Sequence, residues 1–432
     1  MKTILTHGPV FLTLVAITFA AFGYLMTTPL WDNVDFDIFC DAYAQSQNTS
    51  DMFRHIGFYF SQPLLQLIFM LEFRAFGLDP TWYIGINLII HAISSFVVFM
   101  LVNMLFPKKS VAFLAATLFA LGVGSYGKML MATHQLESLL LANLHLLILY
   151  FFIRNDFRRK GKIISPLFLF GLFLYLITGL TKTASFSLIG TLIAYKAFFY
   201  RWRNGRAIFS LDIMAFIVVG ILFHWAQGRW GFQGQVVLQE TNPFDHFTLV
   251  SFKNIFRYLN LMFFPMQASP VLDSSSIWVQ WAFEARTLIR TFVTLSIISF
   301  SFFGFVFGNK AIRFFIAWTY ITLMPFTGHS ISGNWLNLNH LYLTSLGFCV
   351  ILASGTVSCS NLLVVRRWRR YVPYLVPLIF ILLSLGLTYK LDAHHRAFAR
   401  SPRGLEFHQG LKDCCSEMAS GIHESRDSGP SE

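Results

Sequence analysis

The most constraining feature of this sequence is a series of apolar stretches, each close to the ~20 residues that an α-helix needs to cross a bilayer. We find eleven, at 9–28, 82–106, 111–125, 136–153, 165–180, 183–200, 207–226, 287–307, 312–326, 339–358 and 372–390. Charged residues are only 12% of the chain, whereas soluble domains carry about 25%. So few charges cannot cover a soluble surface, and a hydrophobic share of 55% excludes disorder. The sequence therefore predicts an all-α polytopic membrane protein with about eleven transmembrane helices.

Segment 57–77 decides the orientation of this bundle, because its mixture of polar and apolar residues fits either a twelfth span or an interfacial helix. Short cytoplasmic loops are enriched in Lys and Arg. If 57–77 lies on the outer surface, one side of the membrane receives Lys2, Lys108, Lys109, Arg154, Arg158, Arg159, Lys160, Lys162, Arg201, Arg203, Arg206, Lys310, Arg313, Arg366, Arg367, Arg369 and Arg370. If it spans, every cluster after the first span moves outside. We therefore interpret 57–77 as a juxtamembrane helix.

This topology divides the chain into a transmembrane domain, 1–390, and a polar tail, 391–432, which we expect to be mobile and on the outer side. The domain contains two large outer loops, at 30–81 and 227–286. We interpret Met1–Met26 as a retained first helix, and we expect a bacterial inner membrane with the outer face in the periplasm. The five cysteines have no disulfide or zinc spacing. Orientation accounts for the net charge of +12, so we expect no nucleic-acid partner.

The first outer loop opens with carboxylates, of which Asp35 and Asp37 are the strongest candidates for chemistry. Carboxylates at a membrane surface can act as general bases or as metal ligands. A solvated acidic loop, or an N-cap for a helix that starts near Asp37, explains the same residues.

Two cations are placed where they could hold a lipid phosphate. Lys182 lies in a tight outer hairpin between two apolar runs, and Arg257 lies in the long outer loop ahead of Pro265. A guanidinium can contact a phosphate with two parallel hydrogen bonds. Snorkelling of Lys182 to the interface and a plain surface charge at Arg257 are the alternatives.

Further polar residues could line a cavity or contact an acceptor: Asn87, His91, His134, Glu137, Asn339, His340 and Tyr342. Polar groups inside a membrane are costly and usually face the interior of the bundle. Helix–helix hydrogen bonding is the simpler explanation of Asn87 and His91. His134 and Glu137 share a helical face, but two residues alone are a weak metal signal.

Five motifs, in order, resemble the type C glycosyltransferases (GT-C), and within them the protein O-mannosyltransferase-like enzymes that carry TPR repeats. Residues 63–92 resemble the family's "RPL…FGLNP…H..N..LHA" region, and the pattern continues through 105–116. The later matches are Leu180-Thr181-Lys182-Thr183 to "LSKE", Arg257-Tyr258-Leu259 with Phe264-Pro265 to "YL…L.P", and residues 339–348 to "RYLYLPSLGF". The chain departs from the pattern at Thr183, Asn339 and His340, and a polar tail replaces the TPR array.

The resemblance implies a GT-C-like bundle in which an acidic first outer loop covers a cavity among the spans. It also implies a sugar donor linked to a polyprenyl phosphate and a glycan, lipid or protein acceptor. Asp35 or Asp37 would then be the general base, and Lys182, with Arg257, would hold the phosphate. The chemistry needs no nucleotide site and no metal, although a divalent cation is compatible with it. The competing classes are a transporter or flippase of a lipid-linked sugar and a non-catalytic polysaccharide-assembly protein.

Overall fold

A computed structural model describes residues 2–29, 63–125, 127–158, 165–179, 186–200, 210–229, 249–263, 286–327, 340–362 and 371–413. Over these ranges the regular structure is helical, with no strand. Each of the eleven apolar stretches corresponds to a helix. These helices are α1 (Lys2–Phe22), extended by η1 (Gly23–Thr27), α5 (Pro80–Leu105), α6 (Lys109–Ala120), α8 (Leu136–Arg158), α9 (Pro166–Gly179), α10 (Ser187–Phe199), α11 (Leu211–Arg229), α14 (Arg286–Phe307), α15 (Lys310–Leu323), α16 (Leu341–Leu362) and α18 (Val372–Ala399).

Five helices in the described ranges are long and apolar enough to cross a membrane: 7–27, α5, 136–157, 341–360 and 373–399. Shorter apolar helices accompany them, among them α6, α9 and α10. The chain is therefore an all-helical membrane protein. The number of crossings, about eleven, stays a prediction.

Four further elements lie between these helices: α4 (Pro63–Phe76), α7 (Lys128–Met131), the short 3-10 helix η2 (Thr133–Gln135) and α12 (Leu249–Phe263). Helix α4 occupies the segment that the sequence predicts to be a juxtamembrane helix. Gly77 ends it in the left-handed conformation, at φ 58°. The Asp79 carboxylate then accepts a hydrogen bond from the Thr81 amide at 3.0 Å and caps α5, with Pro80 in its first turn. The sequence Gly77–Pro80 thus encodes a helix stop followed at once by a helix start.

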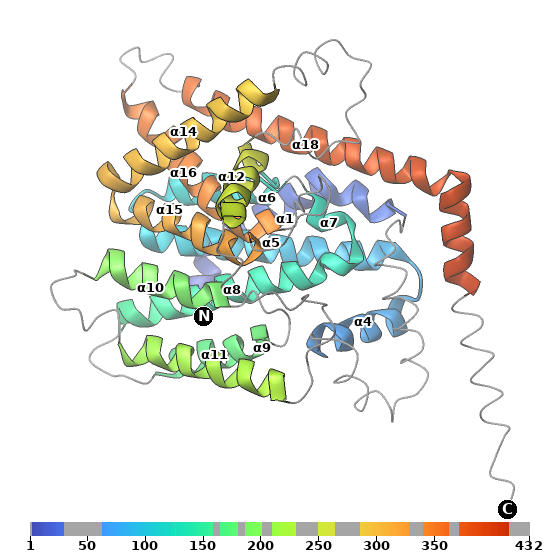
Figure 1. Cartoon of the computed structure of the whole chain (residues 1–432), viewed down its shortest axis with the longest axis horizontal. Coiled ribbons are helices and arrows are strands. Elements are labelled where there is room, and N and C mark those ends of the chain that lie inside the picture. Colours follow the sequence, from blue (N-terminus) through green and yellow to red (C-terminus); the bar gives the residue numbers. More distant parts are fainter. Residues whose placement is uncertain are drawn as a thin grey trace, which may run out of the picture.

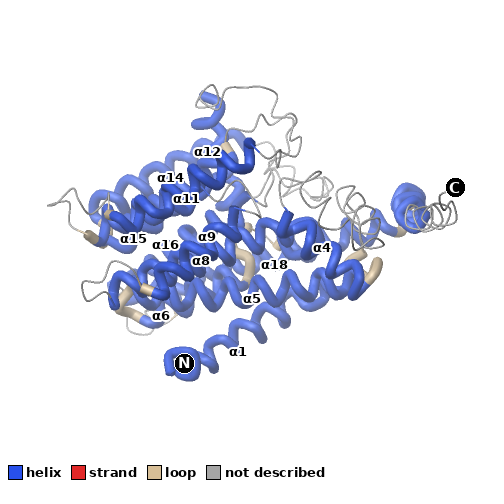
Figure 2. The backbone as a smooth tube through the Cα atoms, turned by 90° about the horizontal axis from the view of Figure 1, so that it is seen from below, coloured by secondary structure: helices blue, strands red, loops and turns tan. Residues whose placement is uncertain are grey.

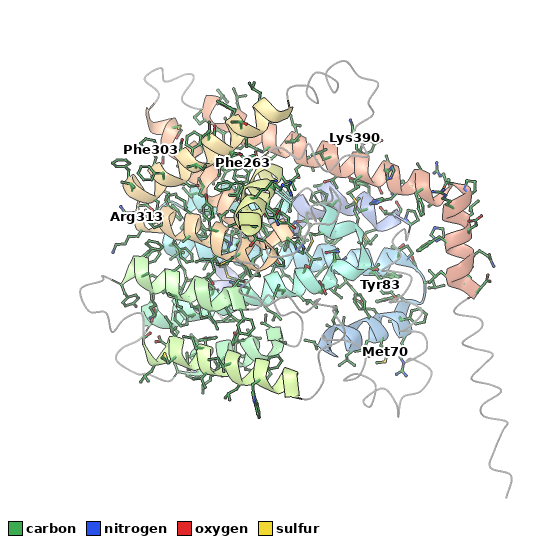
Figure 3. All side chains as sticks on the ribbon, in the orientation of Figure 1. Met70, Tyr83, Phe263, Phe303, Arg313 and Lys390 are labelled. Carbon is green, nitrogen blue, oxygen red and sulfur yellow. The ribbon has the colours of Figure 1, made fainter. Side chains whose placement is uncertain are left out.

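The centre of the bundle is formed by α5, which packs on α1, α6 and α8, and by α16, which packs on α6 and α15. Their facing side chains form one continuous apolar core. Large apolar side chains are exposed on the outward faces of α14 and α18, including Phe303, which Figure 3 labels. Such surfaces are what a lipid-facing helix requires. Figure 2 shows the same bundle from below, with α1 along its edge.

The two ends of the bundle differ. Figure 3 shows Arg313 at one end and Met70 and Tyr83 toward the other, where α4 lies in Figure 1. We call these the Arg313 end and the α4 end. Arg313 donates hydrogen bonds to the carbonyls of Gly308 at 3.0 Å and Val306 at 2.7 Å. The predicted topology assigns the Arg313 end to the cytoplasm and the α4 end to the outer side.

The helices extend beyond the boundaries that the sequence suggests. Helix α18 continues to Ala399, and a further helical segment covers 402–413, so the part of the tail that the structure describes is helical. Helix α12 forms inside 227–286, the segment that the sequence predicts to be a long outer loop and that contains no stretch of spanning length. Both segments mix charged and apolar residues at helical spacing, so they lack the continuous apolar run by which the spans are found.

A buried ion cluster joins α8, α10 and α11. The Lys196 ammonium lies 2.6 Å from the nearer carboxylate oxygen of Asp156 and 3.4 Å from Asp212, and the three side chains are at most 4% exposed. The ammonium also lies 4.4 Å from the centre of the Tyr200 ring. A cation between two buried carboxylates offsets the cost of burying them.

We predict that Lys196→Met leaves those two carboxylates without their cation and destabilises the fold by about 3 kcal/mol. Thermal unfolding of the purified protein in detergent measures the effect. The exposed Lys310, at the start of α15, provides the control, because Lys310→Met removes a solvated charge. Equal unfolding temperatures for Lys196→Met and the wild type would contradict a stabilising role for the cluster.

Candidate functional site

His91 and Tyr342, both predicted from the sequence, meet in the interior of the bundle. His91 Nδ1 lies 2.7 Å from the Tyr342 hydroxyl, and Nε2 lies 3.1 Å from the carbonyl oxygen of Ala120. Because a carbonyl only accepts, Nε2 carries the proton, and Nδ1 accepts from the Tyr342 hydroxyl in the neutral imidazole. His91 is 1% exposed and Tyr342 is 2% exposed. The pair therefore joins α5, α16 and the end of α6.

Asn87 lies one turn before His91 on α5 and donates a hydrogen bond to the carbonyl of Ala132 at 3.2 Å. It ties α5 to the segment between α7 and η2. One turn after His91, Ser94 accepts a hydrogen bond from Asn143 of α8 at 3.0 Å. Since these polar groups bond to protein partners, the geometry favours the interhelical interpretation of Asn87 and His91 over that of free cavity residues.

The turn that follows α6, described at 121–125 and 127, packs closely against α12, α16 and α18. Gly124 and Gly127 adopt left-handed conformations, with φ of 86° and 64°. A Cβ atom on Gly127 would lie 2.6 Å from Thr388 Oγ1 of α18, and one on Gly124 would lie 3.0 Å from Met262 of α12. Only glycine fits both the backbone conformation and the space at these positions. The turn thus brings α12 and α18 onto the core.

His340 and Arg257 lie in neighbouring elements. The His340 ring stacks on Phe326, with centroids 4.2 Å apart and planes at 14°, and meets Tyr258 edge-on at 5.9 Å. Tyr258 is buried in α12 next to Arg257, which is partly exposed. Asn254, one turn earlier, donates to the Thr327 carbonyl at 3.0 Å. Helix α12 therefore packs on the start of α16, two residues before Tyr342.

Glu72, on α4, is a buried carboxyl that the sequence reasoning did not select. It is 6% exposed, and its Oε2 atom has no hydrogen-bond partner among the described residues. Burial raises the pKa of Glu72 from its ordinary value of 4.5 to about 8. Glu72 continues the apolar stripe formed by Leu65 and Phe69, which packs against Leu136. The 3–4 spacing of residues 65, 69 and 72 is the signal that could have identified it as buried.

Most of the remaining predicted residues lie outside the part of the chain that the structure describes. Asp35, Asp37, Lys182 and Asn339 lie outside the described residues, as does the side chain of His134. Glu137 lies in the first turn of α8 and is partly exposed. Within the described ranges no three His, Cys, Asp or Glu side chains are grouped as metal ligands would be.

Comparisons with known proteins find a likeness among solved structures only. No model of a known protein family matches the sequence, and no curated protein does. Among solved structures, the chain is similar to the archaeal oligosaccharyltransferase AglB from Archaeoglobus fulgidus, solved with an inhibitory peptide and a dolichol-phosphate, at a TM-score of 0.49 and 12% identity. The match covers 94% of this chain and 59% of that one, so this chain spans less than two thirds of the length of AglB.

Proposed function

We propose that this protein is a membrane glycosyltransferase of the GT-C kind. It moves mannose or another hexose from a polyprenyl-phosphate donor to an acceptor hydroxyl on the outer face of the membrane. The proposal comes from the order of the family-like motifs in the sequence. The observation that supports it most is their meeting in space: His91 bonds to Tyr342 at 2.7 Å, and His340 contacts Tyr258 at 5.9 Å. Three motifs, spread from residue 63 to residue 348, thus converge on one region.

The proposed reaction is one displacement at the anomeric carbon. Asp35 or Asp37 accepts the proton of the acceptor hydroxyl while its oxygen bonds to that carbon. The bond between the carbon and the phosphate oxygen breaks, and the polyprenyl phosphate leaves with the negative charge. Attack on the face opposite the leaving group inverts the configuration. Lys182, with Arg257, stabilises the charge that grows on the phosphate.

The test of this function is an assay with the purified protein and a radiolabelled polyprenyl-phosphate hexose, with covalent transfer as the readout. A covalent hexosyl product supports the transferase. Movement of the labelled lipid across a vesicle membrane without such a product would overturn it in favour of a flippase. A third outcome would indicate an assembly protein. In that case the purified protein transfers no sugar, but deletion of its gene removes a surface glycan from the cell.

We predict that Lys182→Ala weakens donor binding, because the ammonium is the main cation that we assign to the phosphate. The expected loss is about 10- to 100-fold in donor affinity, in line with the 1.5–3 kcal/mol of a charge-assisted hydrogen bond. Titration with the polyprenyl-phosphate sugar measures it. Lys390→Ala is the control, because Lys390 is exposed on α18, away from the Arg313 end (Figure 3). Unchanged affinity in Lys182→Ala would mean that Lys182 only snorkels.

A further inference from the structure

An exposed aromatic ring lies at the junction between α4 and α5. Trp82, in the first turn of α5, is 54% exposed. Its indole stacks on the ring of Phe76, the last residue of α4, with centroids 5.6 Å apart and planes at 18°. Phe76 therefore covers one face of the indole, and more than half of the Trp82 residue stays open to a ligand.

The turn between the two helices holds this ring in a fixed position. The carbonyl of Gly77 accepts a hydrogen bond from the Tyr83 hydroxyl at 2.7 Å. Tyr83 is buried, and its ring meets Phe76 edge-on with centroids 6.1 Å apart. The cap that Asp79 forms on α5 fixes the backbone on the other side of the turn. A side chain that is ordered in this way before binding loses little freedom when a ligand stacks on it.

Asp79 adds a carboxylate to the same turn. Its side chain is exposed, and only Oδ1 is used by the cap, through the Thr81 amide at 3.0 Å. Oδ2 accepts no hydrogen bond from the residues that the structure describes. Asp79 is the N-cap of α5 and Trp82 is the third helical residue. Side chains at these two positions lie close together, as the reciprocal bonds of a capping box show.

A second exposed tryptophan shows how Trp82 differs from an ordinary side chain of the membrane interface, where tryptophan is common. Trp225 of α11 is 64% exposed, and Ile221 and Leu222, one turn earlier, are exposed as well. No ring in the described part of the chain stacks on Trp225. Such surroundings suit lipid. Trp82 instead lies beside an exposed carboxylate, which is costly to place in hydrocarbon. Its open part is therefore accessible to water and to polar ligands.

An ordered aromatic face next to a carboxylate has the chemistry to bind a hexose ring. One side of a hexose is lined by C–H groups, whose partial positive charge is attracted to the negative face of an aromatic ring. Its hydroxyls can donate to a carboxylate, which only accepts hydrogen bonds. A phosphate would be repelled by Asp79. An acyl chain would remove water from the carboxylate without replacing its hydrogen bonds.

We propose that Trp82 and Asp79 form a subsite for a hexose ring of a glycan acceptor. The sugar stacks on the open face of the indole, and a hydroxyl of the sugar donates to Asp79 Oδ2. The inference rests on the proposed function and deepens it, because it selects the glycan among glycan, lipid and protein acceptors. Figure 3 shows Tyr83, the next residue in the chain, toward the α4 end, which the predicted topology assigns to the outer side.

Binding is tested with the purified full-length chain in detergent and three neutral probes, methyl α-mannoside, methyl α-glucoside and methyl α-galactoside. Saturation-transfer NMR should detect contact of the wild type with the C–H protons of at least one probe. The affinity for that probe should fall about 10-fold in Trp82→Ala and about 3- to 10-fold in Asp79→Asn. Trp82→Phe keeps an aromatic face and should retain most of the affinity. Trp225→Ala, which removes the other exposed tryptophan, is the matched control and should bind like the wild type.

Asp79→Asn retains a good N-cap, so it keeps the test valid if Trp82→Ala does not fold. A wild type that binds none of the three probes would overturn the subsite. Wild-type affinity in a folded Trp82→Ala, or in Asp79→Asn, would also overturn it. Trp82 fluorescence is the difference in emission between the wild type and Trp82→Phe. If brominated phospholipids quench this emission and the hexosides leave it unchanged, Trp82 is an interfacial anchor instead.

The transfer assay tests whether the sugar is that of the acceptor. With a mannose oligosaccharide as the acceptor, its KM should rise about 10-fold in Trp82→Ala. The KM of the polyprenyl-phosphate hexose and kcat should stay the same. A rise in the KM of the donor alone would place the donor hexose on Trp82 and overturn the acceptor assignment. A wild type that binds a hexoside but transfers no sugar would overturn the proposed function and not the hexose subsite, so the two failures are distinct.

Discussion

Replacement of the general base should cause the largest loss of activity, about 10²- to 10⁴-fold in kcat. We expect Asp35→Asn or Asp37→Asn to show it. Asparagine has nearly the shape of aspartate but cannot accept the acceptor proton, so donor binding should persist while the chemical step slows. Single-turnover assays with a saturating polyprenyl-phosphate sugar measure that step directly. Of the two variants, the one with the greater loss identifies the base, and its neighbour should retain most of the turnover.

The same loop contains the controls. Asp32 and Asp41 flank the pair and have the same side chain, so Asp32→Asn and Asp41→Asn test whether any charge change in this acidic loop is harmful. Both control variants should keep turnover within a few-fold of the wild type. Full turnover in both Asp35→Asn and Asp37→Asn would show that the base lies elsewhere. Glu137, which is partly exposed at the start of α8, would then be the next carboxylate to test.

The positions of the helices could be predicted from the sequence because a continuous apolar run is a strong signal. Each of the eleven stretches forms a helix. Helix α12 could not be found in this way, since Lys253, Asn254 and Arg257 interrupt its apolar residues. Its place in the structure depends on tertiary contacts such as that between Asn254 and the Thr327 carbonyl. An amphipathic helix in a loop can be identified only when the surface against which it packs is known, and the sequence does not reveal that surface.

In the candidate site, too, single residues could be selected from the sequence but their bonding partners could not. Asn87 and His91 could be selected because polar groups are rare in a span, and hydrogen bonding between helices was already one of their two interpretations. Their partners include the carbonyls of Ala120 and Ala132, which no side-chain pattern marks. Asp392 was missed for the opposite reason. It follows a span, among polar residues, where a solvated tail is the ordinary expectation. In the structure it is 3% exposed and accepts a hydrogen bond from the distant Thr28.

The pH dependence of stability should have one large contribution from Glu72. Its pKa rises from 4.5 to about 8 because burial disfavours the charged form. The folded state therefore binds the proton more tightly than the unfolded state. This contribution to stability is fully present below pH 4.5, is lost as the pH rises from 4.5 to 8, and stays constant above 8. At about 1.4 kcal/mol per pH unit, the loss between pH 5 and pH 8 is about 4 kcal/mol.

Glu72→Gln should remove this slope, because the amide does not titrate. The measurement is the difference in unfolding free energy between the wild type and Glu72→Gln at several pH values from 5 to 9. Other titrating groups are the same in both proteins and cancel in that difference. Glu406→Gln, at an exposed position of the C-terminal helical segment, is the control for a Glu-to-Gln exchange. A constant difference between the wild type and Glu72→Gln would mean that the Glu72 carboxyl is solvated or paired in the folded protein.

The effect of Glu72 should be concentrated in α4, because Leu65, Phe69 and Glu72 lie on the face of α4 that packs against the bundle. Ionisation places a negative charge in that packed face, where Oε2 has no hydrogen-bond partner among the described residues. Helix α4 should therefore separate from α5 and α8 before the rest of the bundle unfolds. Amide exchange in residues 63–76, corrected for its intrinsic pH dependence, should then rise above pH 8 in the wild type and stay low in Glu72→Gln. If the whole bundle opened together, exchange in α16 would rise to the same extent.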